Sequence, residues 1–297
     1  MNKCPKWKGR TQGGTLGQKG LLFFFRHMSL SFGYAILSVV VIFYMIVNHK
    51  EYKSIWFYFR KIRGHGPFRS FIKAYRNHFL FGQTLLDRFA IFAGKKNCFN
   101  ITITGQELFD EIVNSPKGAV IASSHVGNFE ISGCMLHQTR KRINSIVYGG
   151  EGPIIQLYRE KILIENNVFP VPIMADMSHI FTINKVLRNG EILTIPCDRV
   201  YTGNKIATLS FLGRTASFPA GAYHLAAEFD VPVLTLFVMK ESAKDYHIFI
   251  NRIDNFPQEN LSRKEKVEAL AENYVLELEK MLKKYPEQWY NYYKFWN

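Results

Sequence analysis

The sequence predicts an α/β fold, in which a largely parallel mixed sheet is flanked by helices and preceded by an N-terminal membrane-anchoring helix. After residue 96, short apolar stretches alternate with longer stretches of helical period. Such alternation is typical of a largely parallel sheet with helices on both faces. Near the N-terminus, the 19 residues from Ser29 to Val47 carry no charge, and that length is enough to cross a bilayer.

The elements follow from these patterns in chain order. Strands are expected near 99–104, 119–123, 143–148, 168–173, 191–196, 206–212, 232–239 and 246–252. Helices are expected near 106–114, 128–138, 153–165, 178–188, 220–229 and 262–283. We divide the chain into a basic arm (1–20), a transmembrane or interfacial helix (21–48), a basic amphipathic helical segment (49–96) and an α/β domain (97–297).

The charge is concentrated in the N-terminal third. Residues 1–92 hold 15 Lys and Arg against two acids, whereas residues 93–297 hold 23 against 22. Because the basic residues flank an apolar segment, we expect them to face an anionic membrane surface rather than a nucleic acid. The aromatic content of 15% also suits a protein that works against lipid.

The apolar segment has more than one reading. A cleaved signal peptide would have a shorter apolar stretch and a small-residue cleavage site, and Met45-Ile-Val-Asn-His-Lys50 offers none. The heavier basic charge after residue 48 favours a cytoplasmic C-terminal domain. Since basic residues lie at both ends, a helix in the plane of the interface is the alternative.

Other chemistries lack their motifs. The four cysteines form no Cys-x-x-Cys pair, so neither a disulfide framework nor a zinc site is suggested, and no metal is expected. The chain has no Gly-x-Ser-x-Gly elbow, no phosphate loop and no dinucleotide-binding Gly-x-Gly-x-x-Gly.

One stretch carries acid–base chemistry. In Ala119-Val-Ile-Ala-Ser-Ser-His125-Val-Gly-Asn-Phe-Glu130 a buried strand ends just before a histidine, and a carboxylate follows five positions later. Residues five apart on one helix point away from each other, so the two side chains meet only if His125 lies on a turn before the helix. Gly127 permits such a turn. A carboxylate on one ring nitrogen would raise the basicity of the other, as a general base requires.

Four later segments extend the pattern. They are Leu193-Thr-Ile-Pro-Cys-Asp-Arg-Val-Tyr-Thr-Gly203, Phe211-Leu-Gly-Arg-Thr-Ala-Ser-Phe-Pro-Ala-Gly221, Val231-Pro-Val233 and Pro286-Glu-Gln-Trp289. With the His-x4-Glu motif, they resemble the late acyltransferases of lipid A biosynthesis, which belong to the His-x4-Asp/Glu lysophospholipid acyltransferase superfamily. The resemblance spans residues 100 to 296.

The resemblance implies a membrane-associated O-acyltransferase. His125 would deprotonate a hydroxyl of a lipid A-type precursor, Glu130 would hold and charge the imidazole, and the alkoxide would attack an acyl thioester directly. The donor would be an acyl carrier protein or coenzyme A, acting as a co-substrate, with no cofactor. The expected location is the bacterial inner membrane, with the catalytic domain on its cytoplasmic side.

Further substrate-binding residues are expected around this pair. They are Gly127, Asn128, Arg159, Asp198, Arg199, Gly203 and Arg214. Backbone N–H groups at the start of the helix after Gly127 suit an oxyanion. Arg159 suits a phosphate, although it fits a solvated helix face equally well. Asp198, Arg199 and Gly203 match positions near the acceptor in the resembled enzymes, and an ordinary polar turn is the alternative.

The box around Arg214 departs from the Phe-Pro-Glu-Gly-Thr-Arg box of glycerol-phosphate acyltransferases, which weakens glycerol phosphate as an acceptor. The acceptor alternatives are a lysophospholipid, an amino-acid lipid and an aryl-polyene lipid. A catalytically inactive membrane-binding scaffold is the alternative from another class.

Overall fold

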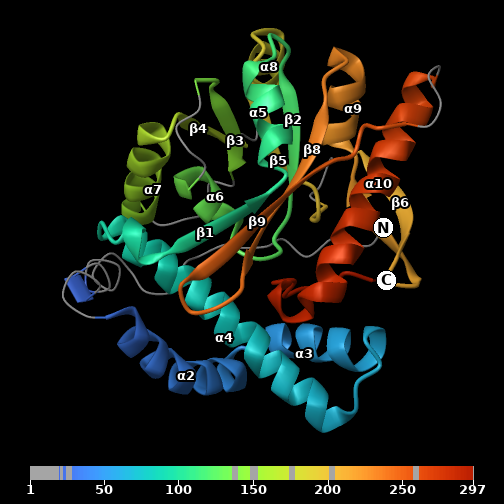
Figure 1. The fold of residues 1–297 in the computed structure, drawn as a ribbon. Coiled ribbons are helices and arrows are strands. Elements are labelled where there is room, and N and C mark those ends of the chain that lie inside the picture. The colour runs from blue at the N-terminus through green and yellow to red at the C-terminus, as the bar shows by residue number, and fades with distance from the viewer. Residues whose placement is uncertain are drawn as a thin grey trace.

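The computed structural model describes residue 20 and residues 23–24, 29–135, 140–147, 153–173, 178–200, 205–256 and 261–296. Its centre is a seven-stranded sheet (Figure 1). The strands are β1 (Asn100–Thr104), β2 (Ala119–Ser123), β3 (Ile143–Val147), β4 (Val168–Pro172), β5 (Ile192–Pro196), β8 (Val233–Lys240) and β9 (Asp245–Arg252). The helices around it are α5 (Gln106–Asn114), α6 (Phe129–Met135), α7 (Pro153–Glu165), α8 (His179–Arg188), α9 (Gly221–Phe229) and α10 (Arg263–Lys284).

The sheet is mixed and largely parallel, which confirms the predicted fold class. The strand order is β1-β9-β8-β2-β5-β3-β4, and only β8 and β9 pair antiparallel. All five residues of β2 are buried, because the sheet is covered on both faces. Val120 and Ala122 enter one apolar core, and Ala119 and Ile121 enter another.

The C-terminal half also contains a hairpin that the sequence patterns predicted only in part. β6 (Ile206–Phe211) was expected as a strand, but β7 (Arg214–Pro219) was not, and the two form a separate antiparallel pair. Leu212 and Gly213 both have positive φ, as a two-residue turn of this type requires. Leucine seldom adopts that conformation, so the turn has a weak signal in the sequence.

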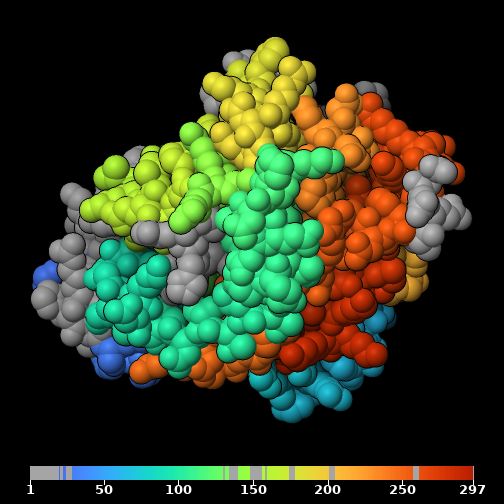
Figure 2. Space-filling view, turned by 45° about the horizontal axis from the view of Figure 1, so that its top comes forward, coloured from blue at the N-terminus to red at the C-terminus, as the bar shows by residue number. Residues whose placement is uncertain are grey.

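The N-terminal segments form helices at one end of the molecule, at the bottom of Figure 1. They are α2 (Leu30–Val47), α3 (His49–Phe57), a π-helical turn η1 (Tyr58–Ile62) and α4 (Pro67–Phe92). By length and hydropathy, α2 is able to cross a membrane. In the space-filling view, parts of the N-terminal helices are visible along the left and lower edges of the molecule (Figure 2).

A buried polar cluster joins these helices to the sheet. The carboxylate of Asp87 on α4 pairs with the ammonium of Lys240 at the end of β8, and both side chains are at most 1% exposed. Tyr34 on α2 and Tyr246 on β9 each donate a hydroxyl hydrogen bond to Asp87. Burial raises the pKa of Asp87 and lowers that of Lys240, in each case against the effect of the partner.

Breaking this pair on one side should be costly. Asp87→Asn or Lys240→Met leaves an uncompensated buried charge, which typically costs about 3–5 kcal/mol of unfolding free energy. The matched control is Lys117→Met at the surface pair Lys117–Asp230, whose side chains are 61% and 76% exposed, and it should cost at most about 1 kcal/mol. Thermal unfolding in detergent measures both. Equal effects at the two pairs would contradict the burial argument.

Candidate active site

His125 lies, as predicted, in the turn between β2 and α6. The turn follows the carboxyl end of β2, beside the carboxyl end of the neighbouring parallel strand β5. In open α/β sheets, this edge is where ligands bind.

The carboxylate that the structure places on His125 belongs to Asp198. Asp198 Oδ1 lies 2.8 Å from His125 Nδ1, and the backbone N–H of His125 donates to Asp198 Oδ2 at 2.9 Å. The register explains this meeting, because Ser123 pairs with Pro196 and each side chain follows its strand end by two residues. We had expected Asp198 near the acceptor; its contact with His125 is a role that the sequence interpretation missed.

The electrostatics favour a charged Asp198. Its side chain is 1% exposed, and although burial alone would raise its pKa, the adjacent His125 and Arg199 lower the pKa below its usual value. An ionised carboxylate only accepts hydrogen bonds, so Nδ1 of His125 carries the proton and the basic lone pair is on Nε2. The pair therefore has the form of an oriented general base.

The expected partner, Glu130, lies in the first turn of α6, and its side chain falls outside the described atoms. Its predicted contact with His125 therefore stays a prediction. Asp198 occupies Nδ1, so a role for Glu130 at this site has to differ from holding that nitrogen.

The backbone of the candidate catalytic turn, residues 124–128, is held from two sides. The N–H of Gly127 donates to the carbonyl of Gln288 at 2.8 Å, and the N–H of Asn128 donates to the carbonyl of Val238 at 2.7 Å. Tyr290 N–H donates to the carbonyl of His125 at 3.2 Å. The N–H groups of residues 127 and 128 are therefore committed within the fold and do not serve as donors for an oxyanion.

The Pro286-Glu-Gln-Trp289 motif thus has a structural role. Trp289 bridges to Val126, and its side chain is 1% exposed within the aromatic core. The Gln288 side chain exchanges two hydrogen bonds with the backbone of Lys240 on β8. The C-terminal aromatic residues therefore pack onto the domain.

Gly127 is required by two features of the turn. Its φ is +67°, and a Cβ there would lie 2.0 Å from the carbonyl oxygen of Val238. Gly127→Ala should therefore lower the unfolding free energy by about 1–3 kcal/mol or more, because strain and clash add. Gly221→Ala is the control, since a Cβ there meets nothing within 4 Å. Equal melting temperatures for the two variants would contradict this reading of the turn.

The remaining predicted residues are more dispersed. Arg199 donates from Nη2 to the carbonyl of Tyr290 at 2.9 Å, which ties the loop after β5 to the tail. Arg159 lies on α7, which packs against α6 and β4. Arg214 begins β7 on the separate hairpin, with its guanidinium 5.9 Å from the ring centroid of Phe57. Gly203 lies outside the described residues.

Ser124 and Cys197, which lie next to His125 and Asp198 in the sequence, have structural roles. Ser124 Oγ accepts a hydrogen bond from the N–H of Val126 at 3.2 Å, inside the turn. Cys197 is buried, and burial raises the pKa of its thiol, which leaves it inert. Within the described residues, no group of three or more His, Cys, Asp or Glu side chains is placed to hold a metal.

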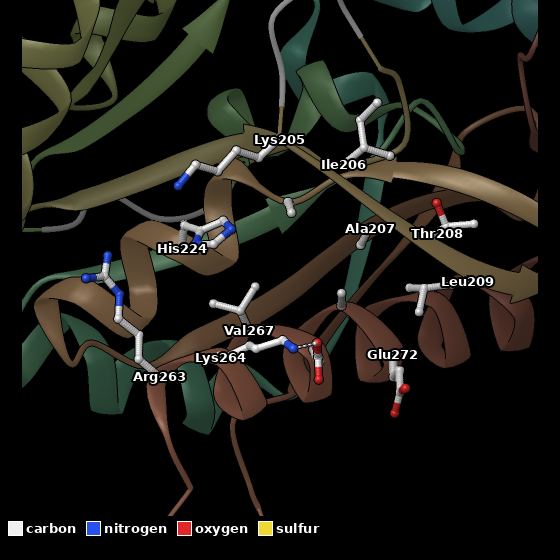
Figure 3. Close-up of a pocket in the computed structure, with 13 residues that line it drawn as sticks. Lys205, Ile206, Ala207, Thr208, Leu209, His224, Arg263, Lys264, Val267 and Glu272 are labelled. Carbon is white, nitrogen blue, oxygen red and sulfur yellow. Dashed lines mark ion pairs between the residues drawn. The ribbon is translucent and has the colours of Figure 1, made fainter.

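A groove of about 780 Å³ lies elsewhere, between β6, α9 and α10 (Figure 3). Lys205, His224 and Arg263 gather at one end of it, and Leu209 and Glu272 lie toward the other. Neither the catalytic turn nor Asp198 lines this groove. We therefore assign it no part in the chemistry at His125.

The fold and the His125–Asp198 pair are those of an α/β protein with a candidate general base at the carboxyl edge of a largely parallel sheet. The family follows from comparison with known proteins: residues 80–297 match the model of the bacterial lipid A biosynthesis acyltransferases. The match covers more than two thirds of the chain, so the chain belongs to this acyltransferase family. No curated protein matches it.

Proposed function

We propose that this chain is a membrane-associated O-acyltransferase, which transfers a fatty acyl group from an acyl thioester to a hydroxyl of a lipid A precursor. The family supports an acyl donor and a lipid-type acceptor. The observation that carries the mechanism is the buried carboxylate of Asp198 on Nδ1 of His125.

In this mechanism, Nε2 of His125 takes the proton of the acceptor hydroxyl as its oxygen attacks the thioester carbonyl. Asp198 stabilises the imidazolium that forms, because its negative charge lies against Nδ1. The tetrahedral intermediate then collapses, so the new carbon–oxygen bond remains and the carbon–sulfur bond breaks. The departing thiolate recovers the proton from His125, and no acyl-enzyme forms.

Glu130 belongs to the same proposal through the His-x4-Glu motif. It lies on the helix that begins four residues after His125, so it starts at the edge of the same turn. A second carboxylate there would lie near the acceptor hydroxyl. Acyl carrier protein and coenzyme A both remain as carriers of the donor acyl group. Their acyl thioesters are cytoplasmic, which suits a catalytic domain on the cytoplasmic side of the inner membrane.

The proposal is tested by mass spectrometry of lipids from a strain that lacks the gene. Lipid A should lose the mass of one ester-linked acyl chain, and the wild-type gene should restore it, whereas a His125→Ala gene should not. If lipid A were unchanged and a phospholipid, amino-acid lipid or aryl-polyene lipid were missing, the protein would still be an acyltransferase. The acceptor would then be that lipid and not a lipid A precursor. Full restoration by His125→Ala would overturn the mechanism.

A further inference from the structure

Helix α2 is fastened to the globular domain near its N-terminal end. The hydroxyl of Tyr34 donates to the buried carboxylate of Asp87 on α4 and lies 3.2 Å from the carbonyl oxygen of Ala243, in the β8–β9 turn. Asp87 is in turn paired with Lys240. Withdrawing α2 would remove one hydrogen-bond donor from a buried carboxylate, which is costly.

The middle of α2 is fastened as well. Leu37 packs directly over Gly82 of α4, so closely that a Cβ on Gly82 would lie 2.6 Å from Leu37 Cδ1. The hydroxyl of Tyr75 on α4 donates to the carbonyl of Ser38 at 2.9 Å. The absence of a side chain at Gly82 thus allows α2 and α4 to pack closely at this point.

The C-terminal end of α2 completes the attachment. Val41 and Met45 are buried, and the hydroxyl of Tyr44 donates to Glu51 of α3 at 2.7 Å. The ring of Tyr44 also lies 6.2 Å from that of His78 on α4, measured between centroids. Contacts therefore run along the whole of α2.

Helix α4, to which α2 is attached, belongs to the catalytic domain. The side-chain amide of Asn77 donates to the carbonyls of Glu287 and Trp289, at 2.9 and 2.8 Å. Lys73 forms an ion pair with Glu287. Trp289 bridges to the catalytic turn, so α2, α4 and the active site are parts of one packed body.

This packing disfavours an α2 that crosses the bilayer. If α2 crossed the bilayer, its middle residue Ser38 would lie near the membrane centre, and Tyr75 and its neighbour Arg76 would lie there too. The Arg76 side chain is 61% exposed. At the other end, exposed Lys244 follows Ala243, which contacts Tyr34. Charged side chains at the bilayer centre are costly, so this orientation is disfavoured.

The outer face of α2 suits a membrane surface instead. Its exposed apolar side chains are Phe32, Ile36, Val39, Val40, Ile42, Phe43, Ile46 and Val47. Further exposed apolar side chains lie at the end of α3 and the start of α4, namely Phe57, Phe68, Phe71 and Ile72. Exposed basic residues lie among them, at Lys50, Lys53, Lys61, Arg69 and Arg76. Apolar side chains bordered by basic ones match the acyl boundary and headgroups of an anionic bilayer.

We propose that α2 lies in the plane of an anionic membrane and does not cross it. Its outer face, with the end of α3 and the start of α4, forms the lipid-binding surface of the protein. This surface lies at the end of the molecule where α4 contacts the Trp289 segment, so it brings the catalytic turn close to the bilayer. The proposal concerns attachment, and it stands or falls independently of acyl transfer.

Depth measurements on spin-labelled protein test the orientation. Single cysteines are placed at Phe32, Val39 and Ile46 of the full chain, after the four native cysteines are replaced with alanine. These positions are 47%, 69% and 72% exposed and follow one another at seven-residue intervals, so they share a face and are about 10 Å apart along the axis. The labelled proteins are placed in vesicles that contain anionic lipid.

An in-plane helix puts all three labels at one depth, about 5–10 Å below the headgroups. A crossing helix puts the label at Val39 near the bilayer centre, about 15 Å from either surface, with the other two much shallower. Equal depths support the proposal. A maximum at Val39, or no contact of any label with lipid, overturns it.

Vesicle binding tests the charged border of the surface. Replacing Lys50, Lys53, Lys61 and Arg69 together with glutamine should weaken binding to anionic vesicles by 10²-fold or more, since each contributes about fivefold. The control replaces Lys117, Lys185, Arg188 and Lys264, which are exposed at the opposite end of the molecule, and should leave binding almost unchanged. If both quadruple variants lost the same affinity for vesicles, binding would depend only on net charge, and the assignment of this surface would be wrong.

Discussion

His125→Ala is expected to lower acyl transfer by about 10²–10⁴-fold, the usual contribution of a positioned general base. The loss should appear in kcat with either thioester donor, because deprotonation of the acceptor belongs to the chemical step. Folding should change little, since the ring is partly exposed and the turn is held by its backbone. The initial rate of thiol release in the presence of acceptor measures the effect.

The matched control for this variant is His224→Ala. His224 is partly exposed on α9 and lines the separate groove beside α10, so its loss should leave the rate within about twofold, as expected for a surface substitution. If His125→Ala retained near wild-type turnover with both donors, His125 would not be the base.

Asp198→Asn is expected to lower the rate by about 10²-fold or more, because it removes the charge that stabilises the imidazolium and places an amide where an acceptor is needed. The acid limb of the pH–rate profile should also move to lower pH, since a protonated ring is no longer favoured by a neighbouring anion. In the wild type, the pKa of Asp198 is lowered, so this carboxylate stays charged through neutral pH and the limb does not report its own titration.

The same variant has a predictable effect on stability. A carboxyl group whose pKa is lower in the folded state than in the unfolded chain stabilises the fold. The contribution is complete above the pKa of the unfolded chain, about 4, and is lost as the pH falls through the pKa of the folded state. The difference in melting temperature between wild type and Asp198→Asn should therefore be largest near neutral pH and shrink below about pH 4.

Glu130→Gln is the informative companion to Asp198→Asn. If Asp198 orients the imidazole of His125, Asp198→Asn should shift the acid limb of the pH–rate profile more than Glu130→Gln does. A normal rate and an unshifted profile for Asp198→Asn, with both changed in Glu130→Gln, would return the orienting role to Glu130.

Much of the fold could be predicted from periodicity. The expected strands at 119–123, 191–196 and 232–239 appear as β2, β5 and β8 with boundaries shifted by at most one residue. Buried parallel strands form short apolar runs between polar turns, and that signal is local. Sheet order is set by long-range packing, so the neighbouring positions of β2 and β5 did not follow from the pattern.

In the candidate site, too, the local feature was predictable from the sequence and the long-range contact was not. His125 on a turn after a strand was predictable, because the apolar run ends there and Gly127 permits the bend. The pairing with Asp198 was not, since it requires β2 and β5 to be neighbours in register. Once that register is known, the equal two-residue offset from Ser123 and Pro196 identifies the pair.

Helix α4 shows why its packing could not be deduced. The sequence indicated a basic amphipathic helical segment over 49–96 but not which of its faces packs against the domain. In the structure, Phe68 and Ile72 are exposed, while Asn77, His78 and Asp87 are buried against the domain. Partners far along the chain, such as Lys240 and Trp289, satisfy these polar groups, so no local pattern reveals the inward face.

The central claim is most directly tested by mass spectrometry of a purified lipid A precursor after incubation with the full-length protein and an acyl thioester. We expect the precursor to gain the mass of one ester-linked acyl group, at a rate that falls by at least 10² in His125→Ala and in Asp198→Asn. The account would be contradicted if the precursor remained unmodified while the thioester was consumed, or if acylation proceeded equally well in both variants.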